Sequence, residues 1–411
     1  MVFIFFIFLL SCWISLCLAK INNIVVFGDS YSDLGNRQLS SNGPLWSQHL
    51  AIGWNASLYS FAFSGATCDQ SLYQQSNNTT APSSPSIVDQ LEIYYQQQLN
   101  LKPEDTIYAF WVGYNDIYNM LQTNDQNYDQ LTDCIIQQMH NVRKVFGTNR
   151  FLMFTLVPMD KMPYFNKDND KIALQRQKQA IDNFNQLLHE KVSNLVKHHQ
   201  SLELDLVDAH DLLKDMVNNP DEFGFKDGQH SFWDTCQGQC HESVDDYIWW
   251  DKTHLTGGAH RIIANSILVS GSMEPSVTLP SPEVVDDMIQ TPGSRFQSPH
   301  YKAKFNTGII DKLVKEINTA KQDDKNPLTQ DDDDLDELDE DDWMLRPLYI
   351  GALCTVMLCI GFVLYNKQQS KRRTSDGGSL AALSGLVNRN RDNGRGRFTP
   401  LRNMESSSTV V

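Results

Sequence analysis

The sequence lacks any sustained basic patch with interleaved aromatic residues between its two long apolar runs, which argues against a nucleic-acid-binding protein. No internal repeat is evident, so nothing indicates a repeat array. Positive charge is scarce: 34 Lys and Arg face 50 Asp and Glu, for a net charge of −16. Ten of the acidic residues lie in the single run 331–342, so the net charge says little about the partners of the folded part.

Long apolar runs are confined to two places. Residues 1–19 are almost wholly apolar and end in a small residue, as a secretory signal peptide does. The basic start of such a peptide is missing, so an uncleaved membrane anchor is the alternative interpretation. Residues 347–365 are 19 uncharged residues, enough to span a bilayer, with a buried core helix as the alternative. Acidic residues precede this run and basic residues follow it: Lys367, Lys371, Arg372 and Arg373. We therefore expect a single-pass type I membrane protein whose folded part is extracellular or lumenal.

The remaining chain divides by composition. Residues 20–271 alternate apolar and polar stretches and are the expected folded domain. Residues 272–346 are interrupted by Pro and Ser and include the acidic run, so we expect a stalk with one weakly amphipathic stretch near Ile309–Ile317. Residues 366–411 are basic and rich in Gly, Ser and Asn, which predicts a disordered cytoplasmic tail.

Four cysteines lie outside the two apolar runs, and an oxidising compartment favours two disulfides. Cys236 and Cys240 are close in sequence and are predicted to pair, which leaves Cys68 for Cys134. The alternative is a zinc site built from two cysteines and two histidines: Cys236, Cys240, His230 and His241. Three glycosylation acceptors suit the same compartment: Asn55, Asn77 and Asn78.

Short apolar runs alternate with helical patterns through the expected domain. Five runs are predicted strands: Ile24–Phe27, Leu58–Phe63, Thr106–Val112, Phe151–Val157 and Leu202–Val207. They are apolar nearly throughout, as strands covered on both faces are. Apolar residues recur at helical spacing between the later runs, for example at Ile135, Met139, Val142 and Phe146. The pattern predicts an α/β fold, a three-layer α/β/α sandwich around a parallel sheet of about five strands.

A serine stands where the first predicted strand ends. The run Ile24–Phe27 breaks at Gly28 into a turn that contains Ser30, and the carboxyl ends of parallel strands face the crevice where such sheets bind ligands. A serine nucleophile needs a base, and Asp251 precedes His254 at a spacing that lets the carboxylate orient the imidazole. Each motif alone also fits an ordinary turn.

An attacking serine also needs donors for the oxyanion that forms. Gly65 follows the second predicted strand and can present a backbone N–H with no side chain in the way. Asn115 follows the third and carries an amide N–H pair. The recurrence of such residues after successive strands indicates one site.

Four blocks, FGDSYSD, SGA, GYND and DKTH, occur in order between Asn23 and Gly271, and together they resemble the GDSL, or SGNH, hydrolases. The resemblance implies a flavodoxin-like SGNH fold and a catalytic triad of Ser30, Asp251 and His254. It also implies an oxyanion hole formed by Ser30, Gly65 and Asn115. Tyr31 stands where the family name has leucine, a packing position.

A finer resemblance is to fungal acetylesterases of carbohydrate esterase family 16. It rests on Asn42-Gly43-Pro44-Leu45-Trp46, on Gly65-Ala66-Thr67-Cys68, on the stretch around Asn115, and on the cysteine pair before Trp250-Asp251. Trp46 and Trp250 are the candidate platforms for a sugar ring, because both are expected in loops next to the motifs.

The expected function is a serine ester hydrolase that removes acetyl or other short acyl groups from carbohydrate, with no metal and no cofactor. A lipase, phospholipase or acyltransferase of the same superfamily is one alternative. An inactive surface receptor or adhesion module is the other, although all four blocks are intact. The expected partners are the ester substrate and, through one C-terminal helix, a membrane.

Overall fold

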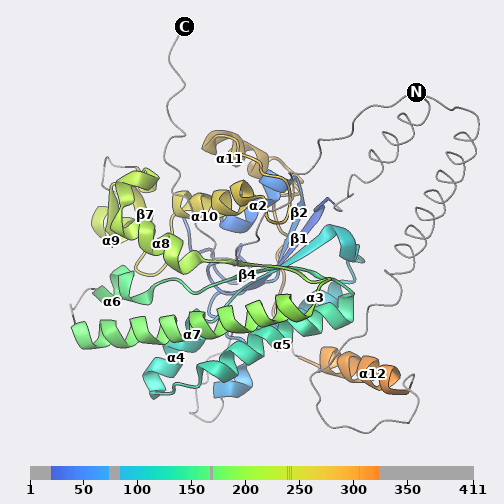
Figure 1. Ribbon diagram of the computed structural model, residues 1–411. Coiled ribbons are helices and arrows are strands. Elements are labelled where there is room, and N and C mark those ends of the chain that lie inside the picture. The colour runs from blue at the N-terminus through green and yellow to red at the C-terminus, as the bar shows by residue number, and fades with distance from the viewer. Residues whose placement is uncertain are drawn as a thin grey trace, which may run out of the picture. The chain divides into compact units, whose positions relative to one another are not determined.

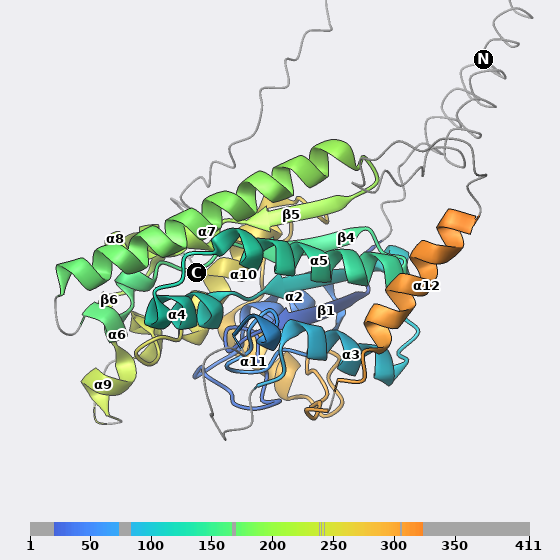
Figure 2. The same ribbon diagram turned by 90° about the horizontal axis from the view of Figure 1, so that it is seen from below.

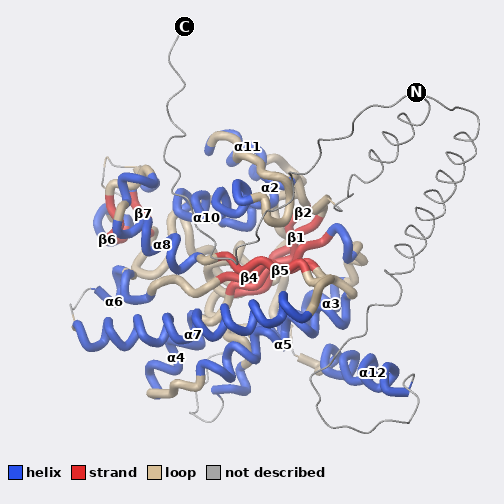
Figure 3. Tube along the Cα trace, viewed as in Figure 1, coloured by secondary structure: helices blue, strands red, loops and turns tan. Residues whose placement is uncertain are grey.

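A parallel five-stranded sheet lies at the centre of the structure, a computed structural model (Figures 1 and 3). The strand order is β2-β1-β3-β4-β5, and every neighbouring pair is parallel. The strands are β1 (Asn23–Gly28), β2 (Ser57–Ser60), β3 (Thr106–Trp111), β4 (Arg150–Phe154) and β5 (Glu203–Val207). The predicted parallel sheet is confirmed.

The structure describes residues 20–73, 84–166, 170–237, 239, 241, 243–304 and 306–323. The predicted signal peptide, acidic run, membrane span and cytoplasmic tail lie outside these residues, as do Asn77, Asn78 and Cys240. In the described part of the chain, no helix is both long enough and apolar enough to cross a membrane.

Helices cover both faces of the sheet, which makes three layers (Figure 1). One face carries α2 (Trp46–Trp54), α10 (Gly257–Ser270) and α11 (Pro282–Gln290). The other face carries α3 (Ile87–Gln97), α5 (Tyr128–Phe146) and α7 (Lys171–His198), and Figure 2 shows α5 and α7 side by side. Ile135, Met139 and Val142 of α5 are buried, as their spacing predicts.

Smaller elements complete the described fold. Three helices follow β3, β4 and β5 respectively: α4 (Tyr114–Thr123), α6 (Pro163–Asn166) and α8 (Ala209–Asn218). A two-stranded sheet of β6 (Asp227–Ser231) and β7 (Tyr247–Trp249), with α9 (Phe232–Cys236) between its strands, precedes α10. This small sheet positions the segment that carries Asp251 and His254.

The strand β1 is the point at which the order of the sheet reverses. Ile24 pairs with Leu58 of β2 on one side and with Ile107 of β3 on the other. In sheets of this kind the ligand crevice lies beyond the carboxyl end of the strands at the reversal. The backbone N–H groups of Phe61 and Phe63 donate to Val26 O (2.8 Å) and Gly28 O (3.1 Å), so the chain after β2 runs beside the same strand end.

The predicted end of the domain at Gly271 is wrong. Val285 and Ile289 of α11 are buried, and the following segment runs along the edge strand β2. There the N–H of Leu58 donates to Arg295 O (2.9 Å), and Tyr301 stacks on Phe61 with ring centroids 4.0 Å apart. The apolar residues of this segment are separated by Pro, Ser and Gly, so no periodicity revealed them.

The folded part continues into α12 (Ile309–Asp323), which packs against α3 and α5. The Glu92 carboxylate accepts hydrogen bonds from the backbone N–H groups of Thr307 (2.6 Å) and Gly308 (3.0 Å), just before this helix. Ile310 is buried. The weakly amphipathic stretch expected in a stalk is therefore a helix of the domain.

A disulfide joins Cys68 to Cys134, as predicted. It ties the loop after β2 to α5. Cys236 is buried and also disulfide-bonded, which contradicts the alternative zinc site, while its predicted partner Cys240 lies outside the described residues.

Replacing Tyr301 by alanine should lower the free energy of unfolding by about 3 kcal/mol, because the change removes a buried ring that stacks on Phe61. Chemical denaturation of the full chain measures this. The neighbouring exposed residue gives the control, and Lys302→Ala should shift stability by less than about 0.5 kcal/mol. Equal stabilities for the two variants would contradict a structural role for this segment.

Candidate active site

The turn after β1 is held by backbone contacts that leave no room for a side chain at Gly28. A Cβ atom there would lie 2.5 Å from the carbonyl oxygen of Trp111. The fully buried Gln90 side chain closes the strand end, accepting from Gly28 N (2.9 Å) and donating to Gly28 O (2.9 Å). The N–H of Asp29 donates to Trp111 O (3.3 Å). Ser30 is thereby held just beyond the carboxyl end of β1.

The three residues of the candidate triad lie in one chain of hydrogen bonds. Ser30 Oγ is 2.9 Å from His254 Nε2. His254 Nδ1 lies 2.9 and 2.8 Å from the two carboxylate oxygens of Asp251. Asp251 Oδ1 also accepts the backbone N–H groups of Thr253 (2.8 Å) and His254 (2.8 Å), which fixes the carboxylate in the turn.

The Asp251 carboxylate is stabilised in its ionised form. Partial burial raises its pKa, but the hydrogen bond and charge of His254 together with the two backbone N–H groups outweigh burial, so the pKa lies below its ordinary value. Asp251 therefore stays ionised at neutral pH and keeps the His254 proton on Nδ1. Nε2 is then free to accept the proton of Ser30.

Tyr31 supports the imidazole from the side. Its hydroxyl donates to Thr253 O (2.6 Å), and its ring stacks on Trp111 with centroids 5.1 Å apart. The residue that departs from the family name thus links the serine turn to the histidine loop. The sequence indicated only a packing position here.

Gly65 and Asn115 lie in the loops that follow β2 and β3. Gly65 has a φ of +83°, a conformation that glycine adopts readily. The Asn115 amide donates one hydrogen to Ala66 O (2.8 Å), which joins the two loops and leaves its second N–H without a hydrogen-bond partner among the described residues. Asp116 accepts the backbone N–H of Cys68 (3.0 Å) and makes a further tie between these loops.

The carboxylate of Asp33 joins the serine turn to the loop that contains Gly65. It is fully buried and accepts the backbone N–H groups of Gly35 (2.9 Å), Asn36 (2.7 Å), Gln38 (3.1 Å) and Ser64 (2.7 Å). The Ser64 hydroxyl adds a further bond (2.8 Å). Sequence reasoning missed this role, although an acid three residues after the serine was visible in the first block.

Trp46 is not a binding residue, so this prediction is wrong. It begins α2, its side chain is fully buried, and its ring centroid lies 4.5 Å from that of Phe154. Its indole N–H donates to Tyr31 O (3.1 Å). The turn residues before Trp46 suggested a loop, but the indole enters the core beneath the serine turn.

Trp250 is partly exposed and belongs to an aromatic cluster next to Asp251. Its ring stacks on Phe232 (centroids 5.9 Å apart) and contacts Trp233 (5.6 Å). Trp233, which sequence reasoning missed, is 55% exposed, and its backbone N–H donates to Trp250 O (3.0 Å). Adjacent aromatic residues at 232 and 233 were its only signal in the sequence.

Asp208, His210 and Asp211 are the one group within the described residues that has the spacing to hold a metal ion. Asp208 caps α8, accepts the backbone N–H of Asp211 (3.0 Å), and lies 3.2 Å from the hydroxyl of Thr155. These bonds explain the cluster without an ion, and it shares no residue with the triad.

Asp29 is a completely buried acid directly beside Ser30. Its Oδ1 accepts the N–H of Tyr31 (3.1 Å), while Oδ2 has no hydrogen-bond partner among the described residues. Burial, helped by the nearby charges of Asp116 and Asp33, raises the pKa of Asp29 to about 7.

Asp29→Asn should therefore change how stability depends on pH. A carboxyl whose pKa is higher in the folded than in the unfolded protein holds its proton more tightly when folded, so the free energy of unfolding falls as pH rises from about 4 towards 7. Asparagine does not titrate, so between these pH values the free energy of unfolding of the variant should rise by roughly 2 to 4 kcal/mol relative to that of wild type. Urea unfolding at several pH values measures it. Exposed Asp125→Asn is the control, and parallel curves for wild type and Asp29→Asn would contradict the assignment.

Curated relatives match part of this chain. The thermolabile hemolysin of Vibrio parahaemolyticus is 23% identical over 283 residues, which cover 62% of this chain and 64% of the hemolysin. A GDSL esterase/lipase of Arabidopsis thaliana is 28% identical over 189 residues, which cover 42% of this chain and 52% of the plant protein. The chain thus spans less than two thirds of the length of either relative.

Solved structures give weaker matches. The acetylxylan esterase Axe2 of Geobacillus stearothermophilus is 11% identical with a TM-score of 0.35, over 62% of this chain and 96% of that one. The acetyl xylan esterase AlAXEase is 14% identical with a TM-score of 0.35, over 59% and 96%. Scores of this size establish no common substrate.

The sequence model of the family described as GDSL-like Lipase/Acylhydrolase matches residues 24–267, which is more than half of the chain and contains all four blocks. Its limits fall on β1, which presents Ser30, and on α10, which follows His254. The chain belongs to the GDSL-like lipase/acylhydrolase family.

Proposed function

We propose that this domain hydrolyses carboxylic esters, with Ser30 as nucleophile, His254 as general base and Asp251 as the group that orients it. One observation carries the proposal: Ser30 Oγ lies 2.9 Å from His254 Nε2 although the two residues are 224 positions apart, and Asp251 holds the other ring nitrogen. That arrangement activates a hydroxyl for attack on an ester carbonyl.

The proposed reaction has two halves. His254 Nε2 accepts the Ser30 proton as Oγ bonds to the carbonyl carbon, and collapse of the tetrahedral intermediate expels the alcohol, which takes that proton. Water then loses a proton to His254 and attacks the acyl-serine ester. The second intermediate releases the acid and returns the proton to Ser30.

The oxyanion formed in each half is assigned to the backbone N–H groups of Ser30 and Gly65 and to the amide of Asn115. Because one amide hydrogen of Asn115 is held by Ala66 O, the orientation of the other is fixed before substrate arrives. A donor placed in advance contributes most, since no reorganisation is needed as charge develops.

Short acyl esters of carbohydrate are the proposed substrates. The support is the sequence resemblance to acetylesterases of carbohydrate esterase family 16 and the aromatic cluster at Trp250 and Trp233, which offers flat apolar surface beside Asp251. Lipid esters are the second candidate, favoured by the names of the hemolysin and the plant esterase/lipases.

The proposed location is the extracellular or lumenal side of a membrane. The support lies in the sequence, where residues 1–19 read as a signal peptide and residues 347–365 as a single span with a basic cytoplasmic flank. Asn55, one of the three glycosylation acceptors, is exposed at the end of α2 and so accessible to modification.

The substrate class is tested with the purified full chain, wild type beside Ser30→Ala. The assay follows hydrolysis of p-nitrophenyl acetate, butyrate and palmitate and release of acetate from acetylated xylo- and chito-oligosaccharides. We expect activity on acetyl esters that Ser30→Ala lowers by at least about a thousandfold. A preference for palmitate would support the lipid alternative, and activity equal to that of the variant on every substrate would support an inactive receptor.

Asp251→Asn should lower kcat by about a thousandfold or more and leave KM within a few-fold, because the amide does not stabilise the imidazolium and favours the wrong tautomer. Steady-state kinetics on p-nitrophenyl acetate measures this. Thermal unfolding must show that the variant is folded. A loss below about tenfold would overturn the role given to Asp251.

A further inference from the structure

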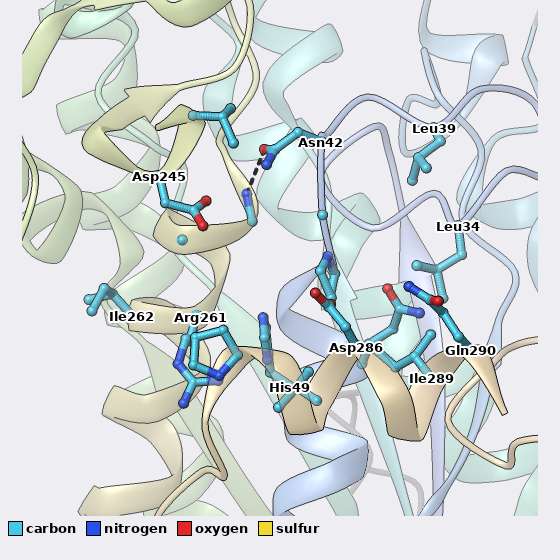
Figure 4. Close-up of a pocket in the computed structure, with 18 of the residues that line it drawn as sticks. Leu34, Leu39, Asn42, His49, Asp245, Arg261, Ile262, Asp286, Ile289 and Gln290 are labelled. Carbon is cyan, nitrogen blue, oxygen red and sulfur yellow. Dashed lines mark hydrogen bonds between the residues drawn. The ribbon is translucent and has the colours of Figure 1, made fainter. Parts of the chain in front are cut away.

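A hollow lies away from the triad. It is an open groove of about 920 Å³ between α2, α10 and α11, and neither Ser30 nor His254 lines it. Figure 4 shows side chains entering it from separate elements: His49 from α2, Arg261 from α10, Asp286 from α11 and Asp245 from the turn before β7. We call it the α2/α10/α11 groove.

His49 lies at the buried side of this groove and is only 3% exposed. Its ring has a weak contact with the backbone of Gly257, but neither nitrogen makes a hydrogen bond within the described residues. Burial first, and the charge of Arg261 second, lower the pKa of His49 to about 3. The ring is therefore neutral at ordinary pH and offers one donor and one acceptor.

Arg261 supplies a second group of this kind. Its Nη2 donates to Pro280 O, while the buried Nη1 has no hydrogen-bond partner among the described residues. Leaving a buried polar group unpaired costs about 1 to 3 kcal/mol. Both residues line the groove, but their unpaired nitrogens are closed to solvent, so a molecule in the groove pairs with them only when the lining side chains move aside.

The charges around the groove restrict what can enter. Asp245 and Asp286 both face it, and burial together with the charge of Asp245 raises the pKa of Asp286. Two carboxylates oppose a phosphate or sulfate, and in the described residues no set of three metal-ligating atoms converges here. Neutral groups that both donate and accept fit this mixture of carboxylates, guanidinium and imidazole.

We propose that the α2/α10/α11 groove binds a neutral oligosaccharide chain. Sugar hydroxyls donate to Asp245 and Asp286 and accept from Arg261 and His49, and the exposed Leu39 offers an apolar surface to the face of a sugar ring. The site takes several residues of the polymer rather than the acyl group, because the triad does not line it.

The groove is joined to the loop that holds His254. Asn42 at its rim accepts the N–H of Gly257 (3.0 Å), and the hydroxyl of Ser41 donates to Leu255 O (3.0 Å). A chain bound here is retained next to the catalytic loop, which raises the local concentration of its acyl esters. In this respect the inference rests on the proposed carbohydrate substrate.

The test is isothermal titration of the full chain carrying Ser30→Ala with xylohexaose and with N-acetylchitohexaose, in a detergent that has no sugar headgroup. Neither oligosaccharide carries an ester. We expect saturable binding of at least one of them that Asp286→Asn or Arg261→Gln weakens about tenfold, the loss of one hydrogen bond to a charged group. Asp287→Asn, an exposed neighbour on α11 that does not line the groove, should change Kd less than about twofold.

His49→Leu gives a second readout. It removes two unpaired buried nitrogens, so thermal unfolding of the free protein should occur at the same or a higher temperature while oligosaccharide binding falls at least about fivefold. If His49 had only a structural role, its replacement by leucine would not weaken oligosaccharide binding.

Absence of binding at about 10 mM oligosaccharide, or binding that all groove variants leave unchanged, would overturn the inference. The outcome is separable from that of the proposed function. If the groove variants lose binding but the wild-type protein releases no acetate from acetylated oligosaccharides, the proposed hydrolase substrate is rejected and the proposed binding site in the groove is supported. Acetate release by wild type, without binding in the groove, would reject the groove alone.

Discussion

The close approach of β1 and β3 at Gly28 is the constraint on which the site depends. The carbonyl of Trp111 occupies the space of a Cβ, and Gln90 pairs with both backbone groups of Gly28 from the side. The chain must therefore turn at Asp29, which places Ser30 at the carboxyl end of the strand. Because the order of the sheet reverses at this strand, loops from both neighbours reach the same point.

Three buried carboxyl groups surround this turn, and their hydrogen bonds give them different roles. Asp33 accepts hydrogen bonds from five backbone N–H groups and one hydroxyl, and these bonds join two loops. Asp116 accepts the N–H of Cys68. Asp29 receives one bond and leaves an oxygen unpaired within the described residues, and burial raises its pKa to about 7. Burial thus favours the protonated form of Asp29, which carries no negative charge beside Ser30.

Much of this fold could be predicted because the strands are short, apolar and separated by helices with a clear period. Three of the four blocks follow β1, β2 and β3, so a parallel sheet places Ser30, Gly65 and Asn115 at the same edge. The sequence could not reveal roles that depend on where a side chain points in the fold. Trp46 follows turn residues yet enters the core, and Trp233 lies far from any block yet contacts Trp250. Asp33 and Gln90 join segments that lie far apart in the sequence. No periodic pattern of residues predicts which segments these side chains contact.

The wrongly predicted domain end at Gly271 and the formation of the α2/α10/α11 groove have the same cause. Residues 282–300, interpreted as stalk, pack on α2 and along β2, and they contribute one wall of the groove through α11 and through His300. His300 Nδ1 lies 3.0 Å from Gly35 O, which is held by the Asp33 turn. A domain that ended at Gly271 would leave His49 and Arg261 at an open surface, where water would satisfy them. Because the later segment folds back, Arg261 Nη2 donates to Pro280 O, while Arg261 Nη1 and both ring nitrogens of His49 are buried without a hydrogen-bond partner among the described residues. These three nitrogens are the groups that the proposed ligand of the groove would pair.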